Sequence, residues 1–263
     1  MAHEMIRSEE RSGVAFVTLN RPDVLNSFNR PMARELQAVL DRVAGAAEVR
    51  AVVLTGAGRA FCAGQDLAEV VPPDGSRGPE VAEVIAESYN PLVQRLVALE
   101  KPVVCAINGV AAGAGANIAL ACDFVLAAKS ASFIQAFINI GLVPDSGGTF
   151  FLPRLVGMAR AKALALLGER ISAEQALAFG MIHAVHEPEK LMAEAEALAT
   201  RLAQMPTLAL GLTKRALHAS LDATLESQLE LERTLQGIAG KSHDYHEGVK
   251  AFQEKRKPKF SGR

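Results

Sequence analysis

The feature that most limits the fold is a change of pattern along the chain near Pro188. Before it, continuous apolar runs such as residues 49–58 and 101–109 end in glycine turns, which is typical of buried strands. Segments with helical spacing lie between these runs, whereas after Pro188 the spacing is helical throughout. The sequence therefore predicts an α/β fold, with a mixed core over residues 1–200 and a helical C-terminal region over residues 201–263.

Local signals place the individual elements. A strand is predicted over residues 13–22, because valine and phenylalanine are typical of strands. The helix predicted over residues 172–180 has Ser172 as its N-cap and Gly180 at its end, and a short strand follows it. Residues 72–80 are rich in proline and glycine and predict a mobile loop. Further helices are predicted over residues 29–45, over 82–100 with a bend at Pro91, and over 158–169.

Composition and charge argue against several classes of function. The net charge of −1 over 263 residues favours neither a nucleic acid nor an anionic membrane as a partner. The chain has no Trp and two Tyr, so a stacking platform for bases is not expected. The three cysteines form no C-x-x-C pair, which predicts neither disulfides nor a zinc site and suits a cytoplasmic location. The N-terminal segment lacks the apolar stretch of a signal peptide, and the longest apolar run, residues 103–120, is interrupted by Gly and Asn, so no membrane segment is expected.

Two loops of glycine and alanine follow predicted strands and precede helical stretches. They are "LTGAGRAFCAGQDL", residues 54–67, and "INGVAAGAGANIALACD", residues 107–123. Small residues let a ligand approach the backbone, and unpaired N–H groups at the start of a helix can hold a developing oxyanion. Close packing of a helix on a strand would explain the same residues. A phosphate loop is not indicated, because neither segment contains G-x-x-x-x-G-K-S/T.

The order of several motifs carries more information than either loop alone. "RAFCAGQDL", "NGVAAGAGANIALACD", "GLVPDSGGTFFLPRLVG", "ISAEQALAFGMIHAV" and "EGVKAFQEKRKPKF" occur in this order, and together they resemble the enoyl-CoA hydratase/isomerase family, the crotonases. The resemblance implies a spiral core of repeated ββα units and a helical trimerisation region. It also implies an acyl-CoA thioester as substrate, no separate cofactor, and a homotrimer or a homohexamer built from two trimers.

The resemblance also assigns roles to individual residues. It places the thioester carbonyl in an oxyanion hole made by the backbone N–H groups of Ala63 and Ala114, although glycine is common at the second position. Asp66 could equally cap the helix that follows it. The other residues implied to bind the acyl-CoA are Gly64, Gln65, Asp66 and Leu67, which follow the first donor, and Phe252 and Lys255, which hold the nucleotide, in some members from a neighbouring subunit.

One carboxylate and two absent glutamates bear on the reaction. In the hydratases of this family two glutamates bracket the water, and their positions fall on Asn117 and Phe137, neither of which titrates near neutral pH. The resemblance implies that Asp145 is the acid/base of an isomerase, and its apolar neighbours should raise the pKa of its carboxyl. The alternative is a turn residue that caps nearby N–H groups. Asn117 is expected to contact the substrate or to cap its helix, and Phe137 is expected to contact the substrate.

The whole pattern is most similar to one isomerase subgroup of the family. This subgroup acts on the ring epoxide of phenylacetyl-CoA in phenylacetate breakdown and is also associated with a double-bond shift in dehydroadipyl-CoA. Three alternatives stay open: a Δ3,Δ2-enoyl-CoA isomerase of fatty-acid oxidation, a non-catalytic acyl-CoA-binding subunit that assembles with a hydratase paralogue, and an enzyme with Asp145 as covalent nucleophile. His243 and His246 lie three residues apart with no further ligand evident, so no metal site is predicted.

Overall fold

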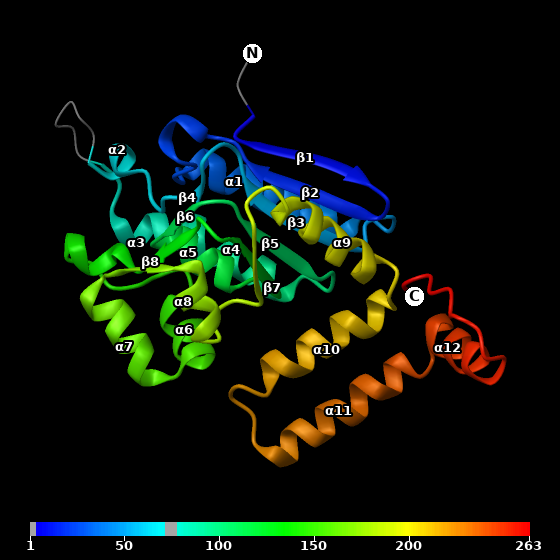
Figure 1. Ribbon diagram of the computed structural model, residues 1–263. Helices are drawn as coiled ribbons and strands as arrows, with labels where there is room; N and C mark the ends of the chain where they lie inside the picture. Colours follow the sequence, from blue (N-terminus) through cyan, green and yellow to red (C-terminus); the bar gives the residue numbers. More distant parts are fainter. Residues whose placement is uncertain (1–3, 72–77) are drawn as a thin grey trace.

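The computed structural model describes residues 4–71 and 78–263, so most of the predicted loop 72–80 lies outside the described residues. Two sheets form the core (Figure 1), with the strand orders β1-β2-β3-β5-β7-β10 and β4-β6-β8-β9. The first sheet consists of β1 Ile6–Arg11, β2 Val14–Leu19, β3 Ala51–Gly56, β5 Val103–Ile107, β7 Phe124–Ala128 and β10 Ala184–His186. The second consists of β4 Ala60–Cys62, β6 Val110–Ala112, β8 Ser132–Ile134 and β9 Arg170–Ser172.

Successive strands alternate between the two sheets. The chain runs from β3 to β4, from β5 to β6 and from β7 to β8, and each pair contributes one strand to each sheet. Strands β3, β5 and β7 pair in parallel, as do β4, β6 and β8. A chain that adds one strand to both sheets and returns through helical segments winds a spiral. The spiral of ββα units expected from the sequence is therefore confirmed.

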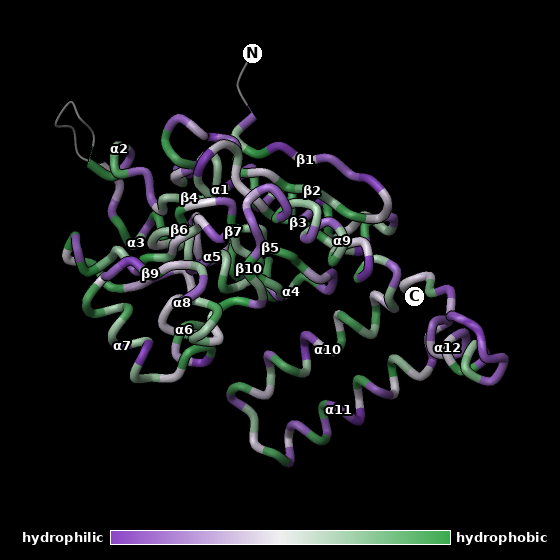
Figure 2. The backbone as a smooth tube through the Cα atoms, in the orientation of Figure 1, coloured by the Kyte–Doolittle hydropathy of each residue, from purple (hydrophilic) through white to green (hydrophobic). Residues whose placement is uncertain are grey.

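Hydrophobic burial explains which strands lie inside. Every residue of β3 and β5 is buried, as their continuous apolar runs predict. Strand β1 pairs antiparallel with β2 at the sheet edge, and its sequence, IRSEER, is mostly charged and exposed (Figure 2). Charged residues on an edge strand discourage pairing with another chain. The sequence pattern missed β1, because an exposed edge strand has no apolar signal.

The helices begin and end close to the predicted positions. Helix α1 begins after Asn29, whose side chain accepts a hydrogen bond from the Met32 N–H at 3.0 Å, and α8 begins with a capping box formed by Ser172 and Gln175. The helix predicted over residues 82–100 is divided by a π-helical turn, η2, before Pro91. The helices of the core are α1 Arg30–Gly45, α2 Leu67–Val70, α3 Val81–Val84, η2 Ile85–Tyr89, α4 Asn90–Ala98, α5 Ala114–Leu120, α6 Gly148–Val156, α7 Met158–Leu167 and α8 Ala173–Ala178, with 3₁₀ turns η1 Pro22–Val24 and η3 Ala136–Ile140.

Four helices make up the C-terminal part. They are α9 Leu191–Ala203, α10 Thr207–Ala219, α11 Leu225–Ala239 and α12 His243–Gln253. Helix α9 packs on β2, β3, β5, β7 and β10, so the predicted boundary at residue 200 falls within a helix that covers the main sheet. Helices α10 and α11 form a hairpin that extends away from the sheets, and α12 lies at the open end of this hairpin (Figure 1).

Replacing Gly115 by alanine should destabilise the core. A Cβ at this position would lie 2.6 Å from Cys62 Cβ and from the Cys62 carbonyl oxygen, so α5 would have to move away from β4. Overpacking of this kind costs about 1–3 kcal/mol of unfolding free energy. Urea unfolding measures the loss, with Gly45→Ala as the control, because a Cβ at Gly45 meets nothing within 4 Å. Equal unfolding midpoints for the wild type and Gly115→Ala would contradict the close packing of these two elements.

Within residues 4–71 and 78–263, no helix is long and apolar enough to cross a membrane. In the same ranges no three His, Cys, Asp or Glu side chains gather as a metal-binding group would require.

Candidate active site

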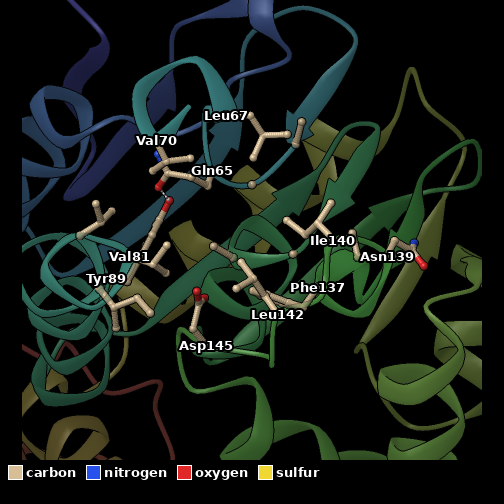
Figure 3. Close-up of a pocket in the computed structure, with 17 residues that line it drawn as sticks. Gln65, Leu67, Val70, Val81, Tyr89, Phe137, Asn139, Ile140, Leu142 and Asp145 are labelled. Carbon is tan, nitrogen blue, oxygen red and sulfur yellow. Dashed lines mark hydrogen bonds between the residues drawn. The ribbon is translucent and has the colours of Figure 1, made fainter. Parts of the chain in front are cut away.

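A cavity of about 230 Å³ lies where the two glycine and alanine loops meet the segment that contains Asp145 (Figure 3). Its walls come from the loop after β4, from α2, α3 and η2, from the start of α5, and from η3 and the segment that follows it. Among the described residues, the lining side chains are apolar except for four: Gln65, Tyr89, Asn139 and Asp145. A mostly apolar pocket with a few polar groups is the usual form of a small-molecule site.

The first loop presents a different backbone donor from the one predicted. The Ala63 N–H donates to the Leu25 carbonyl oxygen at 3.0 Å, so it is already engaged. The Phe28 N–H donates to the Gly64 carbonyl oxygen at 2.7 Å. Because the C=O and N–H of a trans peptide point in opposite directions, the N–H of Gln65 points away from Phe28. The prediction of Ala63 as donor is therefore wrong, and the structure points to Gln65, which lines the cavity.

The second loop presents the N–H of Ala114, the first residue of α5. The Asn117 N–H donates to the Gly113 carbonyl oxygen at 3.1 Å, so by the same rule the Ala114 N–H points out of the helix. Gly113 lies at the turn from β6 into α5 and has a φ of +52°, a backbone angle that residues other than glycine rarely adopt. A Cβ at Gly64 would lie 3.7 Å from the Ala114 nitrogen, so the two loops touch. The N–H groups of Gln65 and Ala114 thus border one cavity, as an oxyanion hole requires.

Asp145 lies in the loop between η3 and α6, and its half-buried carboxylate points into the cavity (Figure 3). The Ser146 hydroxyl donates to Asp145 Oδ1 at 2.8 Å. Burial raises the pKa of the Asp145 carboxyl, and the hydrogen bond from Ser146 lowers it by a smaller amount. The predicted direction of the shift is confirmed.

The carboxylate of Asp145 does not act as a cap. Helix α6 begins after Gly147, which has no side chain to cap it, and the turn is held by the Gly148 N–H, which donates to the Asp145 backbone oxygen at 2.8 Å. Among the described residues, the Asp145 side chain accepts a hydrogen bond from the Ser146 hydroxyl and from no backbone N–H. The capping alternative therefore fails, and the carboxylate is available for chemistry.

The two positions that carry glutamates in hydratases are filled by groups that cannot exchange a proton near neutral pH. Phe137 is buried and lines the cavity. Asn117 is fully buried, and its Nδ2 donates to the Asp145 backbone oxygen at 2.9 Å while its Oδ1 accepts from Gln135 at 2.8 Å. Both ends of the Asn117 amide are therefore used inside the protein. Its predicted contact with the substrate is wrong, and its role is to hold the Asp145 loop.

Comparison with known proteins agrees with this geometry. The family described as Enoyl-CoA hydratase/isomerase matches residues 9–263. The chain belongs to this family. It is 52% identical to the 1,2-epoxyphenylacetyl-CoA isomerase of Escherichia coli K12 over 99% of both chains, and 49% identical over 100% of both chains to a Rhodobacter capsulatus protein named "Probable enoyl-CoA hydratase". The crystal structure of an enoyl-CoA hydratase from Bacillus anthracis superimposes with a TM-score of 0.90 at 34% identity, covering 98% of this chain and 100% of that one.

The other residues expected to bind acyl-CoA after the first donor behave differently from one another. Gly64, Gln65 and Leu67 line the cavity. Asp66 instead caps α2 by accepting from the Ala68 N–H at 3.1 Å and pairs with Arg21 at 2.8 Å. Asp66 is not among the described residues that line the cavity. Its prediction as a binding residue is therefore wrong, and its role is structural.

Phe252 and Lys255 do not reach the cavity within one chain. Phe252 is 86% exposed on α12, Lys255 follows that helix, and α12 lies on the opposite side of the molecule from the cavity (Figure 1). Neither side chain is among the described residues that line this cavity. Their role in binding the nucleotide stays a prediction that requires a neighbouring subunit.

Sequence reasoning missed Tyr89. Its side chain is 2% exposed and lines the cavity, and its hydroxyl donates to Gln65 Oε1 at 2.5 Å (Figure 3). Tyr89 is the last residue of the π-helical turn η2, and such turns occur frequently at functional sites. The local signals were Pro91, which suggested a bend, and the segment YNPLV, which resembles the isomerase subgroup; neither gives the direction of a side chain.

The position of Ser146 makes the pH dependence of this site testable. A base must be ionised, so kcat should fall as pH is lowered through a pKa that lies above the usual 3.8 of aspartate. Ser146→Ala removes the hydrogen bond that lowers this pKa, and the acid limb of the kcat profile should move to higher pH. Ser130→Ala, at an exposed position, is the control. An acid limb that stays in place in Ser146→Ala would contradict the assignment of the limb to Asp145.

Proposed function

We propose that this chain is an acyl-CoA isomerase that converts ring-1,2-epoxyphenylacetyl-CoA to the corresponding oxepin thioester in phenylacetate catabolism, and that it also shifts the double bond of a dehydroadipyl-CoA. The relative of Escherichia coli that is 52% identical carries the name of this isomerase, which supports the choice of substrate. Both reactions rearrange bonds within one molecule, so they need no water and no redox partner.

The observation that carries the proposal is the single carboxylate of the cavity. Asp145 is the one carboxylate that lines it in the described part of the chain, and the two glutamate positions hold Asn117 and Phe137. Addition of water needs a base to activate the water and an acid to protonate carbon. One carboxylate suits a proton shift, because it can return to the substrate the proton that it removed.

Each group in the cavity has one role in the proposed reaction. The N–H groups of Gln65 and Ala114 stabilise negative charge on the thioester oxygen, which makes the α-proton of the substrate easier to remove. Asp145 takes that proton and returns it at another carbon. The apolar wall, including Phe137, excludes water and raises the pKa of the Asp145 carboxyl, which makes it a stronger base.

The proposal includes a homotrimer or homohexamer. Leucines of the C-terminal helices support it, since Leu217 is 65% and Leu225 is 76% exposed in the single chain. A neighbouring subunit would also supply Phe252 and Lys255 to the nucleotide. Native mass spectrometry measures the assembly directly, and a monomer at micromolar concentration would contradict this part of the proposal.

Two incubations test the function. The purified protein is mixed with 2-(1,2-epoxy-1,2-dihydrophenyl)acetyl-CoA and, separately, with a 3-enoyl-CoA, and products are followed by chromatography and mass spectrometry. We expect the epoxide to give a new peak of unchanged mass. Conversion of the enoyl substrate alone would support the fatty-acid isomerase instead. A product heavier by one water would support a hydratase, and no conversion with CoA still bound would support the non-catalytic subunit.

A further inference from the structure

The Gln65 side chain is held at both of its polar atoms. The Tyr89 hydroxyl donates to Gln65 Oε1 at 2.5 Å, and Gln65 Nε2 donates to Glu69 Oε2 at 3.0 Å. Glu69 in turn accepts from the Arg30 backbone N–H at 3.0 Å. This chain of hydrogen bonds runs from the cavity wall to the start of α1 and leaves the Gln65 amide in one orientation.

Phe28 contacts both Gln65's neighbouring peptides and Tyr89. Its N–H and C=O bond to Gly64 and Asp66 at 2.7 Å each, and thereby hold the peptides on either side of Gln65. Its ring meets the Tyr89 ring edge to face, with 6.1 Å between centroids. Phe28 therefore bonds to the peptides on either side of Gln65 and packs on the Tyr89 ring, and the Tyr89 hydroxyl adds a hold on the Gln65 side chain.

We propose that Tyr89 is a positioning residue for the oxyanion hole, and that its hydroxyl acts through the Gln65 side chain to fix the direction of the Gln65 backbone N–H. The inference rests on the proposed function only in requiring a thioester carbonyl at this N–H. Hydrogen bonds weaken steeply as the donor turns away from its acceptor, so a small rotation of the peptide between Gly64 and Gln65 lowers the stabilisation of the oxyanion.

The site favours this role for Tyr89 over direct acid/base chemistry. The hydroxyl hydrogen already lies on Gln65 Oε1, so it is not free to protonate a substrate. Burial, together with nearby Asp145 and Glu69, raises the pKa of Tyr89 far above neutrality, so the hydroxyl is not a base either. What remains for the hydroxyl is to hold Gln65.

Infrared spectroscopy of a bound thioester tests the inference independently of turnover. The probe is phenylacetyl-CoA with ¹³C at the thioester carbonyl, whose stretching frequency falls as the oxygen is polarised. We expect the wild type to lower this frequency relative to free probe, and Tyr89→Phe to lower it less. We also expect kcat in Tyr89→Phe to fall roughly tenfold with KM little changed, less than the ~10²–10³ lost with a whole oxyanion donor.

Matched variants separate positioning from a general loss of structure. Tyr245→Phe changes the second tyrosine of the chain, which is 52% exposed on α12, and should behave as the wild type. If Tyr89 acts through Gln65, then Gln65→Leu should reproduce the effect, and the double variant should be no worse than Gln65→Leu alone. Circular dichroism verifies that each variant is folded.

The possible outcomes are distinct. An unchanged carbonyl frequency and kcat in Tyr89→Phe would overturn the inference, as would effects of Tyr89→Phe and Gln65→Leu that simply add in the double variant. A wild type that polarises the carbonyl but isomerises nothing would contradict the proposed function, while the spectra of the variants would still decide the role of Tyr89.

Discussion

Replacing Asp145 by asparagine should abolish turnover while leaving the fold and acyl-CoA binding nearly intact. The amide fills the same space and keeps the backbone bonds that hold the turn, from Asn117 and from the Gly148 N–H. It cannot remove a proton, and a general acid or base contributes typically ~10²–10⁴ in rate. Steady-state kinetics measures the loss of kcat, and calorimetry with phenylacetyl-CoA measures binding. Asp23→Asn, at an exposed position, is the control.

The same variant should be at least as resistant to unfolding at neutral pH as the wild type. Burial raises the pKa of the Asp145 carboxyl in the folded state, so the folded protein binds this proton more tightly than the unfolded chain does. This carboxyl therefore lowers stability as pH rises above about 3.8, and the full cost is present above its folded pKa. Asparagine removes this cost to the free energy of unfolding.

A fully active Asp145→Asn enzyme would remove the basis for Asp145 as the acid/base.

Replacing Ala114 by proline should cause the second large loss, because it deletes one oxyanion donor. Ala114 is the first residue of α5, where proline is well tolerated since its fixed φ suits a helix and no helical partner needs the N–H. The helix should therefore form normally. The loss of a donor typically lowers kcat by ~10²–10³. The proline ring also takes up space at the N–H, so kcat/KM should fall at least as far.

Ala114→Gly is the matched control, because it keeps the N–H and removes the methyl group. We expect it to retain most of the wild-type rate, since the donor belongs to the backbone. Thermal melts of both variants verify that α5 still forms. If Ala114→Pro turned over substrate as fast as Ala114→Gly, the N–H of Ala114 would have no part in the reaction.

The sequence predicted the parts of the fold that carry a strong apolar pattern. Strands β3 and β5 are continuous apolar runs, and α1 has an apolar stripe that begins after a capping asparagine. The local pattern did not predict the strands of the second sheet, because they are three residues long and lie inside loops that look irregular. Such short strands form because the first sheet brings successive loops side by side, which a local pattern does not record.

The sequence predicted which segments form the site, but not which backbone N–H groups and side chains face the cavity. Motif order led to the correct loop, yet it selected Ala63 instead of Gln65, because which N–H is free depends on the tilt of the peptides that Phe28 and Leu25 hold. The loop alone left the role of Asp145 open, the whole motif pattern favoured an acid/base, and the hydrogen bonds in the structure exclude the cap. Tyr89 reaches the site from a helical turn 24 residues after Gln65, and nothing in its local sequence records this contact.

Hydrogen exchange into a bound thioester tests the central claim most directly, because it depends on the oxyanion hole and on Asp145 but not on the identity of the acyl group. Phenylacetyl-CoA is incubated in D₂O with the wild type or with Asp145→Asn, and deuterium at the α-carbon is followed by NMR. We predict exchange by the wild type well above the rate in buffer, and exchange at the rate in buffer with Asp145→Asn. Equal rates with the two proteins would contradict the account of Asp145 as the base beside an oxyanion hole.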